Sequence, residues 1–288
     1  GAAVTVQEDS STLLTGVTAN SLNLTSAGGI SDAPATAINV TTTSTMNAGG
    51  AITLADNGSD VLSVVGLATF SAPTFNITIG PDGMANFGSL NLNGAAVSVQ
   101  EDSSTLLESV TANSLVMTSA GAITDSATIS VTTTATFNAG GEITLANIAG
   151  EVLSVGGLAT FSAPTFAITI GPAGMANFGS LNLNGAAVSV QEDSSTLLTG
   201  ISANSLALTS AGAITDAPAT TINVTTTSTM NAGGAITLAD NGTDSLSVGG
   251  LATFSAPTFN ISIGPAGMAN FGSVNLNGAI VSVQEDSS

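Results

Sequence analysis

Short runs in which apolar and polar residues alternate recur along the whole chain. In its first third they include SLNLTS (21–26), AINVTTT (37–43), AITLAD (51–56) and FNITIG (75–80). Each run is bounded by Gly, Asn, Asp or Pro, the pattern of half-buried β-strands joined by turns. No segment sustains the 3.6-residue period of an amphipathic helix. The pattern therefore predicts an all-β protein.

One long segment returns at a nearly constant interval. GAAVTVQEDSSTLL opens the chain, and close copies begin at residues 94, 185 and 278, so successive repeats are 93, 91 and 93 residues long. We divide the chain into the repeat units 1–93, 94–184 and 185–277, followed by 278–288 as the start of a fourth. Because the chain begins and ends at the same point of the repeat, we expect it to be a segment of a longer array.

The middle unit is two residues shorter at one place. ISDAPATAINV (30–40) and ITDAPATTINV (214–224) correspond there to ITDSATISV (123–131). A change of chain length is tolerated best where the backbone runs over the surface. We therefore expect a surface turn between two strands at this point.

Each unit contains about four weaker landmarks of related pattern, among them STMNAGG, ATFSAP and ANFGSL. Dividing the unit by four gives roughly 23 residues, which suits one coil of a repeat solenoid whose turns bury their inner side chains on one another. We predict one continuous parallel β-helix (β-solenoid) of about four coils per 91–93-residue repeat. Leu22, Met46, Phe70 and Phe87, with their copies, are the expected internal apolar stack.

The alternative fold is a tandem array of Ig-like β-sandwich domains. A unit of 93 residues is close to the ~100 residues of such a domain. The shorter internal period and the absence of Trp and Tyr favour the solenoid.

The charge pattern excludes several functions. The chain contains no Lys, Arg, His or Cys, and its 19 acidic residues give a formal net charge of −19. Nucleic acid binding needs basic side chains, thiol chemistry and disulfides need Cys, and the usual nucleophile–base pairs need His, Cys or Lys. No apolar run approaches the ~20 residues of a membrane span. We expect neither an enzyme nor a nucleic acid or membrane-inserted protein.

Paired carboxylates, which could hydrolyse glycosides, are the remaining catalytic candidates. They occur at Glu8–Asp9, Glu101–Asp102 and Glu192–Asp193. Adjacent residues of a strand point to opposite faces, so such a pair would not converge on one substrate. We interpret these pairs as solvated acidic turns.

The segments DNGSD (56–60) and DNGTD (240–244) are candidate calcium loops. Each places two carboxylates around an Asn-Gly turn, namely Asp56 with Asp60 and Asp240 with Asp244. Calcium prefers such oxygen ligands. Asn-Gly is also a good turn without any ion, so a calcium site and a plain turn both remain open. The middle unit has ANIAGE (146–151) here and lacks the first carboxylate.

The phrases LTSAGAITD (208–216), ATFNAGGEITLAN (135–147) and VGGLATFSA (155–163) resemble the β-strand repeats of giant bacterial surface proteins. Those repeats are similar to the filamentous-haemagglutinin-like exoproteins and related adhesins. The resemblance implies a right-handed parallel β-helix, export across the cell envelope, and a role in adhesion, sheath or fibre formation.

We therefore expect a structural segment of an extracellular fibre, sheath or giant cell-surface protein, whose partners are copies of itself or neighbouring repeats. The alternative is an adhesin stalk that binds cell-surface glycans or a partner surface. Glycan recognition commonly uses aromatic platforms, and an aromatic fraction of 3% without Trp or Tyr disfavours it.

Overall fold

The computed structural model describes residues 2–286, which form β-strands joined by turns. The chain divides into two compact units, Gly1–Gly141 and Glu142–Ser288, and the boundary between them falls inside the second repeat. Among the described residues, no helix has the length and apolar character needed to cross a membrane.

The described residues of the first unit form fourteen strands. They are β1 (Val4–Glu8), β2 (Thr12–Leu14), β3 (Val17–Ala19), β4 (Leu22–Ser26), β5 (Ile30–Asp32), β6 (Ala37–Val40), β7 (Ser44–Ala48), β8 (Ile52–Leu54), β9 (Val61–Ala72), β10 (Ile77–Ile79), β11 (Met84–Glu101), β12 (Thr105–Ser119), β13 (Ile123–Asp125) and β14 (Thr128–Ala139).

In the second unit, the part of the chain up to residue 286 forms twelve strands. They are β15 (Ile143–Leu145), β16 (Val152–Ala163), β17 (Ile168–Ile170), β18 (Met175–Glu192), β19 (Thr196–Ser210), β20 (Ile214–Asp216), β21 (Thr221–Ala232), β22 (Ile236–Leu238), β23 (Ser245–Ala256), β24 (Ile261–Ile263), β25 (Met268–Gly278) and β26 (Val281–Val283).

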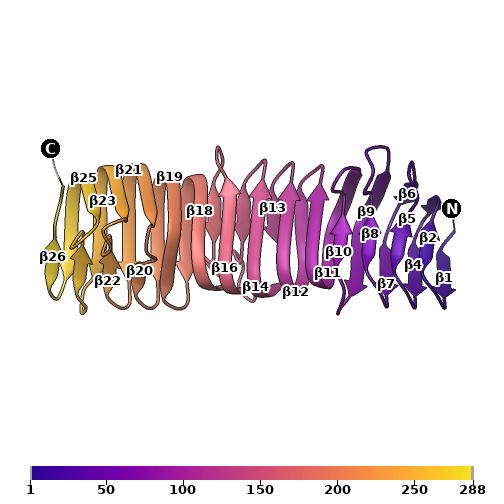
Figure 1. Ribbon diagram of the computed structural model, residues 1–288, viewed down its shortest axis with the longest axis horizontal. Coiled ribbons are helices and arrows are strands. Elements are labelled where there is room, and N and C mark those ends of the chain that lie inside the picture. The colour runs from indigo at the N-terminus through magenta and orange to yellow at the C-terminus, as the bar shows by residue number, and fades with distance from the viewer. Residues whose placement is uncertain (1, 287–288) are drawn as a thin grey trace. The chain divides into compact units, whose positions relative to one another are not determined.

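The strands of the first unit stack in three parallel columns, and the stacked arrows can be followed in Figure 1. One column begins β1–β4–β7–β9. A second runs β2–β5–β8–β10, and a third runs β3–β6–β9–β11. Each turn of chain thus contributes one strand to each column, which is a parallel β-solenoid. The same parallel stacking builds the second unit. The alternative of Ig-like sandwiches, which need antiparallel sheets, is therefore excluded.

The repeat does not contain a whole number of turns. Within residues 1–93, β1 to β8 and β10 give one strand segment each. Strands β9 and β11 each turn a corner and give two, as their register shows. Thirteen segments at three per turn make four and one third turns. The prediction of about four coils holds, and the extra third has a structural consequence.

Each new repeat begins one column further on. Val4, which opens the first repeat, stacks with Leu22 in the column of β1. Its equivalent in the second repeat, Val97, instead stacks on Ile77 in the column of β2. The later equivalents repeat this step, since Val188 stacks on β17 and Val281 on β24. Val4 and Val97, the equivalent residues of the first two repeats, therefore start on different faces of the solenoid.

The core is built from the inward-facing residues of the strands between the first and last turns. Along β4 the burial alternates strictly, and the outward positions carry Asn and Thr. Leu24, Met46 and Phe70 occupy stacked positions in three successive turns, and each is at most 1% exposed. Because such side chains alternate with exposed polar ones, one face of each strand supplies the apolar interior.

The predicted internal stack is buried but divided between columns. Leu22, Met46, Phe70 and Phe87 all belong to the core. Leu24, not Leu22, is the residue in register with Met46. Phe87 comes from a different column and meets Phe70 edge to face, with ring centroids 5.8 Å apart at 75°.

The shortened segment of the middle unit lies in a surface turn, as predicted. In the first unit, residues 33–36 connect β5 to β6, and Pro34 and Ala35 are exposed. The corresponding connection between β13 and β14 consists of Ser126 and Ala127 alone. The deletion therefore changes the length of a corner and leaves the strand columns intact.

Replacing a stacked phenylalanine should be far more costly than replacing an exposed one. Phe70 is 0% exposed and Phe75, five residues away, is 45% exposed. We expect Phe70→Ala to lower the free energy of unfolding by about 3–5 kcal/mol because it leaves a cavity, and Phe75→Ala to lower it by much less. Urea denaturation of the two variants beside the parent chain measures the difference. Equal losses would show that Phe70 is not part of the core.

Candidate metal centre

The loop after β8 is shaped by Asp60. Ala55 opens the loop with a positive φ of 53°. The Oδ2 atom of Asp60 accepts the Asn57 N–H at 3.0 Å, and its Oδ1 atom accepts the Thr36 N–H at 2.9 Å. Asp60 is only 1% exposed. Its carboxylate therefore closes its own loop and also holds the corner of the preceding turn.

A second carboxylate reaches this loop from the preceding turn. Asp32 ends β5, which stacks on β8. Its Oδ2 atom accepts the Ala55 N–H at 3.0 Å. Its Oδ1 atom is buried and has no hydrogen-bond partner, and the residue as a whole is 8% exposed. A buried carboxylate oxygen without a donor is unusual, because native structures satisfy nearly all such atoms.

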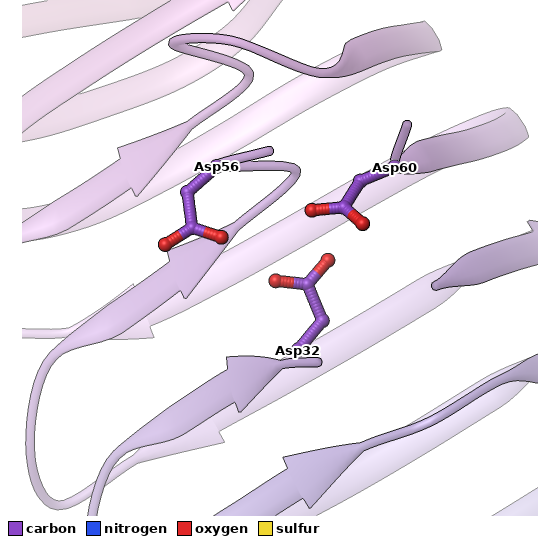
Figure 2. A group of neighbouring side chains, drawn as sticks. All are labelled: Asp32, Asp56 and Asp60. Carbon is purple, nitrogen blue, oxygen red and sulfur yellow. The ribbon is translucent and has the colours of Figure 1, made fainter. Parts of the chain in front are cut away.

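Asp32, Asp56 and Asp60 form one cluster, which we call the first acidic cluster. Figure 2 shows their three carboxylates turned toward a common space. One oxygen from each lies within 4.8 Å of the others. Calcium binds oxygen at about 2.4 Å, so two ligands of one ion can be at most about 4.8 Å apart. The separation of the three oxygens therefore fits a single shared cation.

Asp216, Asp240 and Asp244 form a second acidic cluster with the same geometry, again within 4.8 Å. Asp216 accepts the Ala239 N–H at 2.9 Å and leaves its buried Oδ1 atom without a partner. Asp244 accepts the N–H groups of Asn241 and Thr220. Each contact of the first cluster is thus reproduced in the third repeat.

The surroundings of Asp32 and of Asp216 oppose ionisation of these two carboxyl groups. Burial, reinforced by the charges of Asp60 and Asp56, raises the pKa of Asp32. Burial, followed by the charges of Asp244 and Asp240, raises the pKa of Asp216 to about 6. The chain has no Lys, Arg or His to offset these charges. Beyond the backbone N–H groups already described, compensation of these charges has to come from a proton or an external cation.

The sequence identified four of the six cluster residues. Asp56 and Asp60 lie together, as do Asp240 and Asp244. The pattern did not identify Asp32 and Asp216, which come from the neighbouring turn. Both follow an Ile-Ser or Ile-Thr pair and precede Asp56 or Asp240 by 24 residues, which is about one turn of the solenoid. That recurrence was the available signal, and recognising it requires the strand register.

The structure corrects our interpretation of the paired carboxylates as solvated turns. Glu101 and Glu192 are each 1% exposed. Glu101 accepts the Phe87 N–H and the hydroxyls of Ser103 and Thr105. The exposed Asp102 accepts the Ala85 N–H at 3.0 Å. Together the two carboxylates take the backbone donors of Ala85 and Phe87 in β11.

Each repeat begins one column, or one third of a turn, further on than the repeat before it, and this shift explains the burial of Glu101 and Glu192. Because each repeat begins one column further on, the turn after residue 101 lies against the Met84–Phe87 segment of β11. Glu192 and Asp193 repeat the arrangement against Ala176 and Phe178. Glu8, in the first turn, is half-buried and accepts a hydrogen bond from the Ser10 hydroxyl.

The buried glutamates predict an inverted pH dependence. Burial raises the pKa of Glu101 and of Glu192 above 4.5, despite the hydrogen bonds that lower it. Between that value and the raised folded pKa, the folded chain holds protons that the unfolded chain has released. The stability contributed by these groups is therefore present at low pH and is lost as pH rises through the folded pKa.

We expect Glu101→Gln/Glu192→Gln to lose less stability than the parent chain between pH 4.5 and pH 7. Thermal melting across that range, in calcium-free buffer, measures the slope. Glu108→Gln/Glu142→Gln, which makes the same chemical change closer to the surface, serves as the control. An unchanged slope in the first variant would contradict the assignment.

Comparison with known proteins gives one family. A family model described as "Repeats of unknown function (DUF5649)" matches residues 1–68, 94–152 and 184–245, which together make up more than half of the chain. The first and third matches contain the first and second acidic clusters in full. No curated protein and no solved structure matches this chain.

Proposed function

We propose a structural role for this chain, which belongs to the family of repeats of unknown function (DUF5649). In this proposal the chain is a segment of an extracellular fibre, sheath or giant cell-surface protein. The observation that carries the proposal is the continuity of the strand columns through the repeat junctions. Val97 opens the second repeat, and it pairs with Ile77 before it and Leu115 after it. Val188 does the same between Ile168 and Leu206.

Such junctions support a role that depends on length. A new repeat continues all three columns without a linker, so repeats can be added with no new kind of interface. Because the second repeat begins on a different face from the first, equivalent residues of these two repeats do not form a single recognition surface. This arrangement suits a supporting element better than a one-sided binding surface.

The surface chemistry supports an exposed location. Outward positions carry mainly Thr, Ser and Asn, and the formal net charge is −19. Charges of one sign keep neighbouring molecules apart in solution. A chain without Lys or Arg also offers no cleavage site to trypsin-like proteases. The resemblance to filamentous-haemagglutinin-like exoproteins points the same way.

A binding stalk is the second candidate, and one observation favours it. Phe75, Phe166 and Phe259 are equivalent residues of the three repeats and are 45%, 42% and 45% exposed. Exposed aromatic rings can pack on sugars or on a partner protein. If this is their role, replacing all three by Ala should abolish adhesion to host cells or glycan arrays while the fold is retained.

Surface labelling of the producing cells tests the structural role. Antibodies raised against this segment should decorate intact, unpermeabilised cells on material that projects from the surface. Deleting several whole repeats should shorten that material in proportion, because the columns rejoin at equivalent points. Two outcomes would contradict the proposal. One is labelling that appears only after permeabilisation, and the other is projections whose length does not depend on the number of repeats.

A further inference from the structure

We infer that Asp32, Asp56 and Asp60 bind one calcium ion, and that Asp216, Asp240 and Asp244 bind a second. Each ion would join the end of one strand to the loop of the next turn, namely β5 to the loop after β8, and β20 to the loop after β22. The inference concerns the folded chain itself and stands apart from the proposed extracellular role.

The hydrogen bonds of the first acidic cluster explain only part of the arrangement of its carboxylates. Both oxygens of Asp60 and the Oδ2 atom of Asp32 accept backbone N–H groups, as caps of a plain turn would. The Oδ1 atom of Asp32 accepts none, although it is buried, and Figure 2 shows the Asp32 carboxylate turned toward Asp56 and Asp60. A turn that needed only caps would gain nothing from placing this second oxygen beside two further carboxylates.

The chemistry of the ligands selects a hard divalent cation. All three side chains offer oxygen, and the chain contains no Cys or His to favour a softer metal. Calcium accepts irregular sets of oxygens and completes its shell with water and carbonyl groups. Asp56 is half-buried and Asp240 is exposed, so each cluster keeps an open side for the ion and its water to enter.

The repeats themselves contain a natural contrast. Residues 56–60 and 240–244 are DNGSD and DNGTD, whereas residues 147–151 of the middle unit are NIAGE. These five consecutive replacements are the longest run of substitutions between the first two units. They exchange Asp56 for Asn147 and Asp60 for the longer Glu151. We therefore expect two calcium ions per chain and not three.

Calcium titration of the whole chain tests the site. The protein is freed of metal with a chelator and then titrated with CaCl2 up to about 5 mM, which covers the range of extracellular calcium modules. Isothermal calorimetry gives the stoichiometry, and thermal melting gives the accompanying stabilisation. We expect two bound ions per chain and a melting temperature that rises with calcium.

The Asp32→Asn/Asp216→Asn variant is the decisive comparison. Asn keeps the size of the side chain and an oxygen that can accept the Ala55 or Ala239 N–H, but removes one ligand charge per site. We expect calcium affinity to fall roughly tenfold or more. Asp9→Asn/Glu142→Gln removes the same total charge from two exposed positions and should bind as the parent does.

Two results would overturn the inference. One is a parent chain that gives neither heat of binding nor a change in melting temperature at millimolar calcium. The other is binding of equal strength in the Asp32→Asn/Asp216→Asn and control variants, which would mark it as general attraction to an acidic surface. Melting in chelator verifies that the Asn variant is folded, so that lost affinity reports on the site.

Discussion

The parallel stacking of each strand on its counterpart in the next turn is the interaction on which the rest of this structure depends. It pairs the backbone of one turn with the turns on either side, and it aligns inward side chains such as Leu24, Met46 and Phe70. Because alternate residues point outward, the same stacking places Thr and Asn at the surface. Corners can then change length, as the middle repeat does between Asp125 and Thr128, without disturbing the columns.

The absence of basic side chains imposes a second condition on this interior. A buried carboxylate cannot be offset by Lys, Arg or His, so it needs backbone N–H groups, hydroxyls, a proton or an ion. Glu101 receives three donors and is satisfied within the protein. Asp32 receives one donor on one oxygen and lies beside two more acids. By this contrast, Glu101 acts as a structural cap, whereas Asp32 belongs to a site that a cation would complete.

Sequence patterns predicted the elements of this fold well and their register poorly. Alternation identified the strands, and the long repeat identified the solenoid. The shift of each repeat by one third of a turn could not be predicted from the sequence, because the turns differ in length. Val4 pairs with Leu22, 18 residues ahead, whereas Ser44 pairs with Ala68, 24 residues ahead. The place of Asp32 in the acidic cluster and the burial of Glu101 were not predicted for the same reason. Both depend on which residues of neighbouring turns come into contact. The local pattern of apolar and polar residues contains little information about these contacts.

Cross-linking in this cysteine-free chain tests the register directly. Thr78 and Ser98 are stacked partners on neighbouring turns, about 4.8 Å apart. In a repeat of four whole turns, Ser98 would instead stack on Thr69, because Thr69 continues the column of Thr5. A short bifunctional thiol reagent should therefore join Thr78→Cys/Ser98→Cys efficiently and leave Thr69→Cys/Ser98→Cys largely unlinked. The reverse outcome would contradict the four and one third turns of the repeat.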